Sequence, residues 1–434
     1  MKFLSRLLTI VLTVTLLAGI GVAAYLLYSN LSVPTPTAPT VEFRSVEVGD
    51  VVTIAVVARG ERVVRAELWS EDKLLARDIN PNPALTNTWP LAWQWTPPGP
   101  GVFSLAARAF DDAGRYGASS LFSVVIPPNQ HLLFSSNRDG NPALAPSGLP
   151  LEVPTALSSS ANHSDTQSSR TSHALYSMAI KTRETTLFDT PRSEDRQPNV
   201  SRANVAAFAS NRAGAWHILT RATDADQASD ITPDLSSAQR PVWSADGQQL
   251  AFEVTISNTT NIFVSDAQGQ NRKQVTNADT YDGQASFNPS GDRLAFAAQQ
   301  GGQWDVYAVN LDGTNLTRLT TDAAQDWQPA WSPDGNHIAF ASNRDGISQI
   351  YVMGSNGENV TQLTDFPSGA EQPAWSPDGN WLAFVAYTGA AEGENRREIY
   401  LLYAPQGQAL TEGRGLIRLT QNTFDDTEPA WMGK

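Results

Sequence analysis

The chain of 434 residues contains no cysteine. This absence excludes disulfides, thiolate catalysis, cysteine-ligated zinc or iron–sulfur clusters and a lipid-modified N-terminal cysteine. Charge is also scarce: only 17% of the residues are charged, and 30 Lys and Arg against 44 Asp and Glu give a net charge of −14. Such a chain offers no broad basic surface, so we expect no nucleic-acid partner. The 12 Trp, 30 Gly and 27 Pro are instead typical of many short strands joined by tight turns.

The N-terminus carries an uncharged run long enough to span a bilayer. The run extends from Leu7 to Leu27 behind two basic residues, and about 20 apolar residues cross the hydrocarbon core. We expect residues 1–28 to form a single-pass transmembrane anchor; the alternative is a signal peptide cleaved near Ala24, which would release a periplasmic or secreted protein. In both cases the rest of the chain is extracytoplasmic. The Pro- and Thr-rich residues 29–40 are expected to be an extended linker.

Residues 41–126 show the alternating apolar pattern of short β-strands, with Gly, Pro or Asp at the breaks, which predicts a β-sandwich. The segment from Trp95 to Ser120 resembles the last strands of bacterial Ig-like surface domains, in which a Pro-Gly turn leads to a strand that ends in an Asp-x-x-Gly hairpin. Asp111 and Gly114 are the hairpin residues here. Asp111 and Asp112 are candidate calcium ligands, but two carboxylates fall short of the six to eight oxygens that calcium takes, so we favour a turn.

An internal repeat of 44 residues occupies the remaining sequence. Its marker is a phenylalanine that recurs at Phe208, Phe252, Phe296, Phe340 and Phe384. A second apolar residue follows the first four markers at a constant spacing, and a third one, followed by Thr, comes after that. Each repeat is therefore predicted to contain four strands, and the breaks between them carry turn residues such as Pro-Asp-Gly.

Repeated four-stranded units of about 40 to 50 residues are the blades of a β-propeller. The chain enters the repeat at the second strand of a blade, near Phe134, and ends in a lone first strand, Thr427 to Lys434. We predict an all-β fold: six blades over residues 131–434, the first completed by the C-terminal strand, beside the Ig-like β-sandwich and the N-terminal transmembrane helix. Blade one carries a Ser- and Pro-rich insertion, residues 141–172, which is expected to be disordered.

An aromatic residue in each first strand is expected to pack between adjacent blades rather than to stack on a cofactor. These residues are Trp243, Phe287, Trp331, Trp375 and Trp431.

The motifs PAWSPDGxxIAF, SNRDG and IYVM resemble those of the TolB-like β-propeller, a relative of the WD-repeat family. The resemblance covers His131 to Lys434. It implies a binding domain, since such propellers occur in TolB, a periplasmic partner of the Tol–Pal envelope system, and as non-catalytic domains of prolyl oligopeptidase relatives. The sequence departs from both, with an Ig-like domain in place of TolB's α/β domain and no hydrolase domain. Only the architecture and the binding role are therefore carried over.

Catalysis is not expected. The nucleophile motif G-x-S-x-G is absent, and the five histidines do not fall at metal-ligand spacing. We predict no catalytic residues, no metal site and no cofactor.

Alignment of the repeats places polar residues at two positions close to each first strand, which lines the central channel. Immediately before the strand, the sequence has Gln197, Arg240, Gln284, Gln328, Gln372 and Glu428. Two residues earlier it has Asp195, Ala238, Asp282, Asp326, Ala370 and Asp426. We expect both sets to ring the channel mouth. For the Asp set a turn-forming role is the main alternative, whereas the Gln set has no evident local partner.

The favoured function is that of a membrane-anchored, exported protein whose propeller binds a peptide or protein partner in the cell envelope. The alternative is a channel site for a carbohydrate or another small ligand, with a role in uptake or sensing. We also expect the insertion of blade one, together with Arg396 and Arg397 beside a shorter insertion in blade six, to cover the channel mouth and select the partner. The alternative is a surface insertion that the fold tolerates without a binding role.

Overall fold

The computed structural model describes residues 37–49, 51–84, 87–138, 173–189, 194–388, 396–408 and 415–433. The predicted anchor, nearly all of the linker, and the insertions of blades one and six lie outside these residues, so the predicted flap is not described. In the ranges just given, no helix is long and apolar enough to cross a membrane. The chain divides into two compact units: Met1–Pro97 with Phe103–Val124, and Pro98–Val102 with Val125–Lys434.

The first unit contains two antiparallel sheets. One has the order β1-β2-β5, and the other has the order β4-β3-β6-β7, with β8 paired to β6. The strands are β1 (Thr40–Glu47), β2 (Val52–Arg59), β3 (Val63–Ser70), β4 (Lys73–Ile79), β5 (Thr88–Trp95), β6 (Gly101–Asp111), β7 (Tyr116–Ala118) and β8 (Phe122–Ile126). Strict alternation of buried and half-buried residues along β2 shows that one face of its sheet is covered, as the sequence pattern predicts.

Asp111 forms a turn, as expected. One carboxylate oxygen accepts hydrogen bonds from the backbone N–H groups of Ala113 and Arg115, and the other accepts one from Nε of Arg115 at 2.7 Å. Both oxygens therefore have partners within the hairpin itself.

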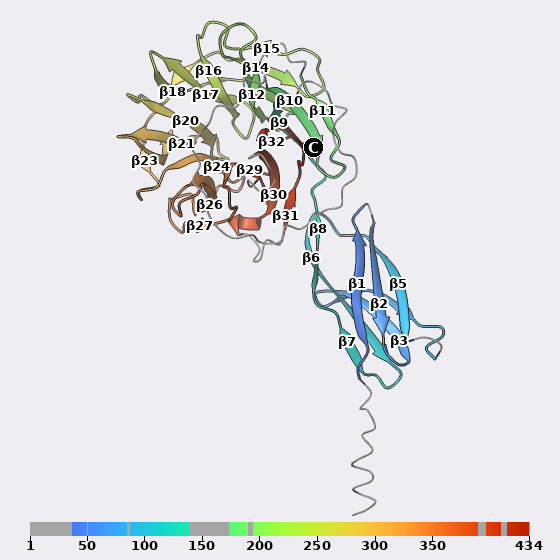
Figure 1. Ribbon diagram of the computed structural model, residues 1–434. Coiled ribbons are helices and arrows are strands. Elements are labelled where there is room, and N and C mark those ends of the chain that lie inside the picture. The colour runs from blue at the N-terminus through green and yellow to red at the C-terminus, as the bar shows by residue number, and fades with distance from the viewer. Residues whose placement is uncertain are drawn as a thin grey trace, which may run out of the picture. The chain divides into compact units, whose positions relative to one another are not determined.

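The second unit is a propeller of six four-stranded groups, which we number as blades one to six (Figure 1). Blade one consists of β32 (Asp426–Trp431), β9 (His131–Ser136), β10 (Ala174–Ala179) and β11 (Thr185–Leu187). Blade two consists of β12 (Asp195–Val200), β13 (Val205–Ser210), β14 (His217–Ala222) and β15 (Ser229–Asp230). Blade three consists of β16 (Ala238–Trp243), β17 (Gln249–Ile256), β18 (Thr259–Asp266) and β19 (Lys273–Gln274).

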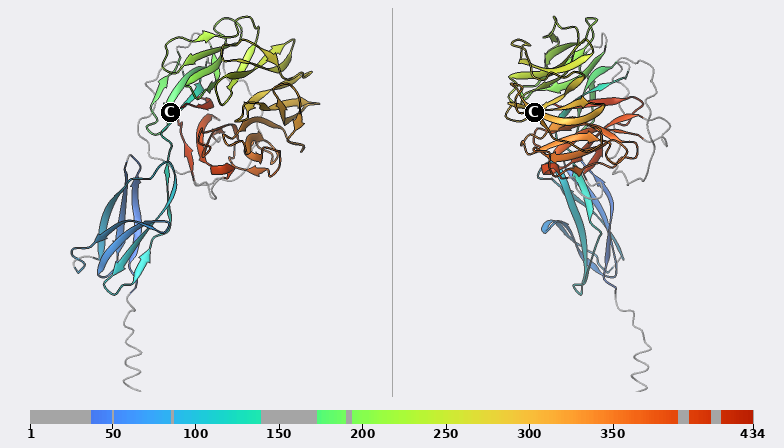
Figure 2. Two further views of the ribbon diagram at one scale, coloured as in Figure 1. Left: turned by 180° about the vertical axis from the view of Figure 1, so that it is seen from behind. Right: turned by 90° about the vertical axis from the view of Figure 1, so that its left-hand side faces the viewer.

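Blade four consists of β20 (Tyr281–Phe287), β21 (Arg293–Gln300), β22 (Gln303–Asn310) and β23 (Thr317–Arg318). Blade five consists of β24 (Asp326–Trp331), β25 (His337–Ser342), β26 (Gln349–Gly354) and β27 (Thr361–Gln362). Blade six consists of β28 (Ala370–Trp375), β29 (Trp381–Tyr387), β30 (Arg397–Tyr403) and β31 (Leu416–Arg418), with the short 3-10 helix η3 (Pro405–Gly407) after β30. Figure 2 shows the blades from behind and from the side.

The repeat markers set the register within each blade. In all six blades the phenylalanine of the second strand lies directly opposite the marker of the third strand, as in Phe296 opposite Tyr307 and Phe384 opposite Tyr400. All six phenylalanines are almost completely buried. The predicted assignment of these residues to second and third strands is therefore confirmed, including blade one, where Phe134 pairs with Tyr176 across the insertion.

The first strands form the inner circle of the propeller. Each inner strand contacts the inner strands of the two adjacent blades, and β32 contacts both β28 and β12. In blade one β32 pairs antiparallel with β9, so that Asp426 lies opposite Ser136.

Aromatic residues at the ends of these strands lie between blades, as predicted. Trp243 belongs to a buried cluster that contains Ala207 and Ile218 of blade two as well as Leu250 of its own blade. The indole N–H groups of Trp375 and Trp431 donate to backbone carbonyls of the preceding blade, those of Ala330 and Ala374.

Candidate functional site

The inner strands begin three residues earlier than the sequence predicts, and four earlier in blade four, which changes the place of the Gln set. Its members lie inside the strands at a β-bulge, where every inner strand shifts register against its neighbour. All six residues have a positive φ, between 48° and 58°. A non-glycine residue in this region is strained and persists only where its surroundings hold it there. The members are Gln197, Arg240, Gln284, Gln328, Gln372 and Glu428.

A hydrogen bond from blade to blade stabilises this strained position. The backbone N–H of Gln328 donates to the side-chain oxygen of Gln284 at 2.8 Å, and that of Gln372 donates to the side-chain oxygen of Gln328 at 2.8 Å. The same bond links Glu428 to Gln372, Gln197 to Glu428 and Arg240 to Gln197. We call this circle of six residues the inner-strand belt.

Arg240 is the one belt member whose side chain has no acceptor oxygen. A residue of the neighbouring strand supplies this oxygen instead. Glu253 of β17 accepts the backbone N–H of Gln284 at 2.7 Å, while its carboxylate lies 3.4 Å from Nε of Arg240 and accepts the hydroxyl of Tyr281. Gly283 makes room for this group, because a Cβ there would lie 2.4 Å from the Glu253 carboxylate. Burial raises the pKa of Glu253, and the charge of Arg240 acts in the opposite direction.

The belt lines a cavity of about 370 Å³ along the channel axis, together with the inner-strand residues that follow it towards the Pro-Asp-Gly hairpins. Pro follows five of the six belt residues, and an aromatic residue three positions on lines the cavity in five of the blades. For Gln197, Gln284, Gln328 and Gln372 the belt bond engages the side-chain oxygen. Among the described residues, no hydrogen bond engages their side-chain nitrogens, so the cavity presents amide N–H donors.

The Asp set does not ring the channel mouth as exposed carboxylates. Three of its members are fully buried inside their blades, each paired with an arginine that follows the second strand: Asp195 with Arg212, Asp326 with Arg344, and Asp426 with Arg138. In each pair the arginine Nε also donates to a serine hydroxyl two residues earlier, at 2.9 Å. The role of these carboxylates is therefore to hold the loop between second and third strands.

Asp282 is the exception in this set. It is 8% exposed, and no cation pairs with it among the described residues. Burial raises the pKa of its carboxyl to about 6, and the nearby hydroxyl of Thr276 opposes that shift. The two blades with alanine at this position, Ala238 and Ala370, also have no arginine at the matching place.

The sequence contains a motif that indicates the Asp–Arg pairs, although an alignment of the first strands alone does not reveal it. The motif Ser-Asn-Arg after the second strand occurs in the three blades with a paired Asp, at Arg138, Arg212 and Arg344. The belt was missed because its partners lie in different blades, 44 residues apart for Gln284 and Gln328. Glu253 and Tyr281 carry no repeat signal at all.

The two arginines expected to lie at the channel mouth form hydrogen bonds within the propeller. Arg396 donates to the backbone carbonyl of Asn422, and the backbone N–H of Arg397 donates to Asp425. Within the ranges that the structure covers, no group of three or more His, Asp or Glu side chains could hold a metal ion.

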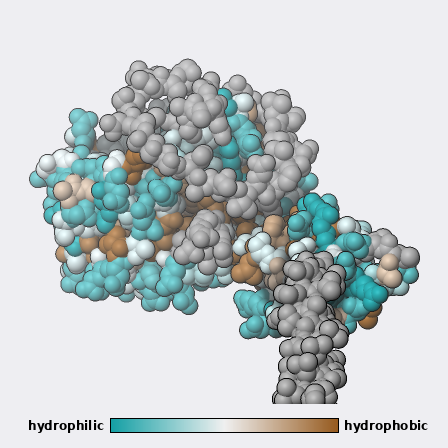
Figure 3. Space-filling model, turned by 60° about the horizontal axis from the view of Figure 1, so that its bottom comes forward, coloured by the Kyte–Doolittle hydropathy of each residue, from teal (hydrophilic) through white to brown (hydrophobic). Residues whose placement is uncertain are grey.

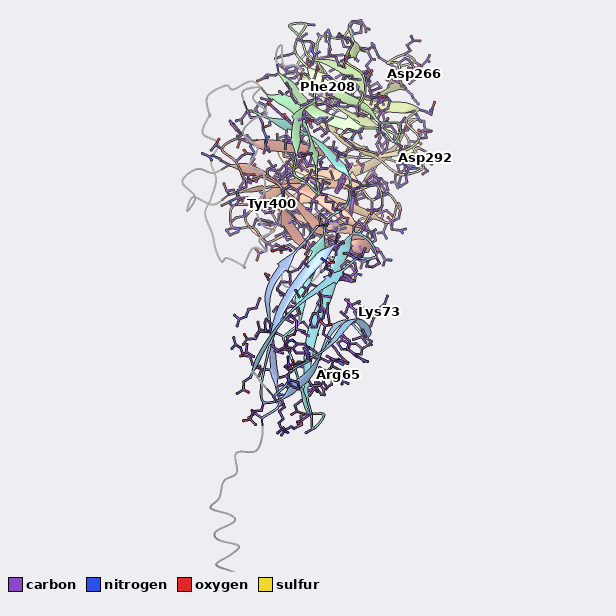
Figure 4. The ribbon with its side chains drawn as sticks, turned by 90° about the vertical axis from the view of Figure 1, so that its right-hand side faces the viewer. Arg65, Lys73, Phe208, Asp266, Asp292 and Tyr400 are labelled. Atoms are coloured by element: carbon purple, nitrogen blue, oxygen red, sulfur yellow. The ribbon has the colours of Figure 1, made fainter. Side chains whose placement is uncertain are left out.

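The propeller surface seen in Figure 3 is mostly hydrophilic, with hydrophobic residues scattered between polar ones. Asp266 and Asp292, from two different kinds of hairpin, lie on the same side of the propeller, and Phe208 lies within its blade (Figure 4). The turn carboxylates Asp266 and Asp292 therefore lie away from the buried core of the blades.

Residues 236–392 match the model of the TolB beta propeller domain. Among solved structures, TolB from Acinetobacter baumannii is 19% identical, with 76% of this chain and 80% of that chain covered and a TM-score of 0.54. Hydrazine synthase from Kuenenia stuttgartiensis is 14% identical over 70% of this chain and 47% of that one, with a TM-score of 0.51. A putative TolB from Agrobacterium tumefaciens is 20% identical over 58% and 88%, with a TM-score of 0.48. No curated protein matches the sequence. The chain thus contains a TolB-like β-propeller.

Proposed function

We propose that the propeller is a non-catalytic binding domain that holds a peptide or protein partner of the cell envelope in the channel cavity. One observation carries this proposal. The belt glutamines use their side-chain oxygens to join the blades, and the nitrogens of the same amides carry no hydrogen bond within the described structure. Donors held in place by a rigid scaffold suit the backbone carbonyls of an extended peptide.

The composition of the cavity supports a peptide rather than a bare ion. Aromatic residues such as Trp375 and Trp431 line it beside prolines, so that apolar walls surround a few polar groups. This is the usual make-up of a binding pocket. A TolB-like propeller also suggests a protein-interaction role in the periplasm.

The cavity volume favours one alternative. About 370 Å³ lies within the range of small-molecule sites, roughly 300 to 1,000 Å³. A carbohydrate or another small polar ligand is therefore the second candidate for the same donors.

For the remaining sequence we propose that residues 1–28 anchor the protein in the cell membrane and that residues 41–126 form an Ig-like spacer outside the cytoplasm. Fractionation of cells that express the native protein tests this. The anchor requires the protein to stay with membranes after a salt or carbonate wash, whereas release into the soluble envelope fraction would indicate a cleaved signal peptide.

The experiment for the channel uses a photo-crosslinking amino acid in place of Ala245, which lines the cavity, and a matched control in place of Gln268, in an outer hairpin of the same blade. We expect covalent adducts with an envelope protein from Ala245 and none from Gln268. Equal labelling from both positions would contradict a channel site.

Two substitutions of one residue separate binding from folding. Gln328→Glu keeps an oxygen for the N–H of Gln372 but removes the amide donor, as Glu428 does naturally; Gln328→Ala removes both. Loss of the adduct in the folded Glu variant supports the proposal. Stabilisation by a carbohydrate in a thermal-shift screen, without any protein adduct, would favour the small-ligand alternative.

A further inference from the structure

Three blades contain the same cation site, built from their own residues. An arginine guanidinium donates to the buried Asp at the start of the inner strand, at 2.7 to 3.1 Å. It also lies 5.2 to 5.6 Å from the centre of the second-strand phenylalanine ring, within cation–π distance. The arginines are Arg138, Arg212 and Arg344.

Blade four keeps the acceptor side of this arrangement and lacks the cation. Its second and third strands, β21 and β22, continue to a two-residue turn at Gly301 and Gly302, both with positive φ. Blade five has a six-residue connection at the same place, between Ser342 and Gln349, and this loop carries its arginine. By alignment, Gln300 stands where blades one, two and five have arginine.

Asp282 is therefore a buried carboxylate without its usual partner. The two other blades that lack the arginine have alanine here, at Ala238 and Ala370, which leaves no charge to compensate. Placing a carboxylate in a buried position without a cation costs free energy. Blade four retains this cost, and Asp282 is a buried acceptor with no cationic partner among the described residues.

A cavity of about 540 Å³ lies at this position. Asp282, Thr276 and Asp279 line it together with Phe296, Gln299 and Gln300. The ring centres of Phe296 and Tyr307 lie 5.9 Å apart with the planes tilted by 31°, much as those of Phe340 and Tyr351 do under Arg344 in blade five. The aromatic and acidic halves of the cation site are thus both present beside a space large enough for a side chain.

We infer that the cavity of blade four is a binding site for a guanidinium group from another molecule, held by Asp282 and Phe296 as the arginines of blades one, two and five are held. The source is either an arginine side chain presented by a peptide or a free guanidinium compound. This site lies apart from the belt cavity and does not depend on the proposed function.

Titration of the full-length protein with capped arginine (N-acetyl-L-arginine N-methylamide) and with agmatine tests the inference, with binding followed by calorimetry or NMR. Capped citrulline has nearly the same shape without the charge and serves as the ligand control. We expect saturable binding of at least one guanidinium probe and at least tenfold weaker binding of capped citrulline. Binding of agmatine alone would assign the site to free guanidinium compounds, and binding of capped arginine to peptides.

Asp282→Asn should weaken guanidinium binding at least tenfold, and Asp292→Asn, in an exposed hairpin of the same blade, should leave it unchanged. Asp282→Ala is a second variant whose fold is supported by Ala238 and Ala370. Both Asp282 variants should melt at or above the temperature of the unsubstituted protein, because neither substitution leaves a buried cation without its carboxylate. Failure of both probes to bind, equal binding of capped citrulline, or undiminished binding to the Asp282 variants would overturn the inference.

Discussion

The inner-strand belt and the Asp–Arg pairs are two polar systems of one propeller, yet they connect different things. The belt uses glutamine amides as acceptors at four of its six links and carboxylates at the other two, lies between blades and passes through all six of them. The Asp–Arg pairs use full charges, lie within single blades and occur in three. The comparison teaches that a repeated polar residue facing an axis holds the ring together, whereas an irregularly repeated charge serves one loop at a time.

Removal of β32 breaks both systems at once and should have the largest effect. Without residues 426–434, β9 loses one of its two strand partners, the belt loses Glu428 and Arg138 loses Asp426. We expect loss of a single cooperative unfolding transition, measured by circular dichroism, because the ring of inner strands is interrupted and the edge of β9 becomes exposed. Trp431→Ala alone should cost about 3 to 5 kcal/mol, as its indole is buried between blades. A truncated protein with an unchanged melting temperature would disprove six blades closed by the C-terminus.

Asp426→Asn breaks one charge pair and leaves the belt in place. Arg138 is 7% exposed, so its charge would stay buried with a weaker partner. Breaking a buried pair from one side costs about 3 kcal/mol or more. Urea denaturation should show this loss, while the matched change Asp282→Asn, where no arginine is left behind, should show none. Similar losses of stability in both variants would contradict the claim that the carboxylate of Asp426 stabilises the fold by pairing with Arg138.

Gln328→Ala breaks the belt at one point and leaves the charges in place. The backbone N–H of Gln372 loses its acceptor, and an unsatisfied buried donor costs about 1 to 3 kcal/mol. Gln328→Glu keeps the acceptor and should lose less. Chemical denaturation of the two variants side by side measures the difference. An Ala variant as stable as the unsubstituted protein would contradict a stabilising role of the belt.

The buried carboxyl of Glu398 allows the effect of a buried charge on stability to be measured through pH. Burial raises the pKa of its carboxyl from an ordinary value of 4.5 to about 7, and the nearby Asp426 adds to the shift. The folded protein therefore binds a proton that the unfolded chain has released between these pH values, and the free energy of unfolding falls as pH rises from about 4.5 to about 7. Glu398→Gln should abolish this decline and stabilise the protein at pH 8 by the order of 1 to 3 kcal/mol, with little effect at pH 4. Parallel pH–stability curves for the two proteins would contradict this assignment.

The parts of the fold that depend on periodicity could be predicted from the sequence. Phe296 and Tyr307 were assigned correctly to the second and third strands because strand spacing within a repeat is short and constant. The position of Gln328 was predicted wrongly, before the strand instead of inside it, since a bulge leaves no mark in an apolar pattern. Its hydrogen-bond partner in the next blade depends on how blades meet, which no local rule describes. The pairing of Asp326 with Arg344 was within reach, because both residues recur together in three repeats.

Hydrogen exchange at the backbone amide of Gln372 tests the central claim most directly, because this N–H is held by the side-chain oxygen of Gln328. The account predicts that Gln328→Ala accelerates exchange at Gln372 while Gln328→Glu leaves it protected, in folded protein at constant pH. Equal protection in both variants would contradict the claim that the belt residues join the blades through their side-chain oxygens.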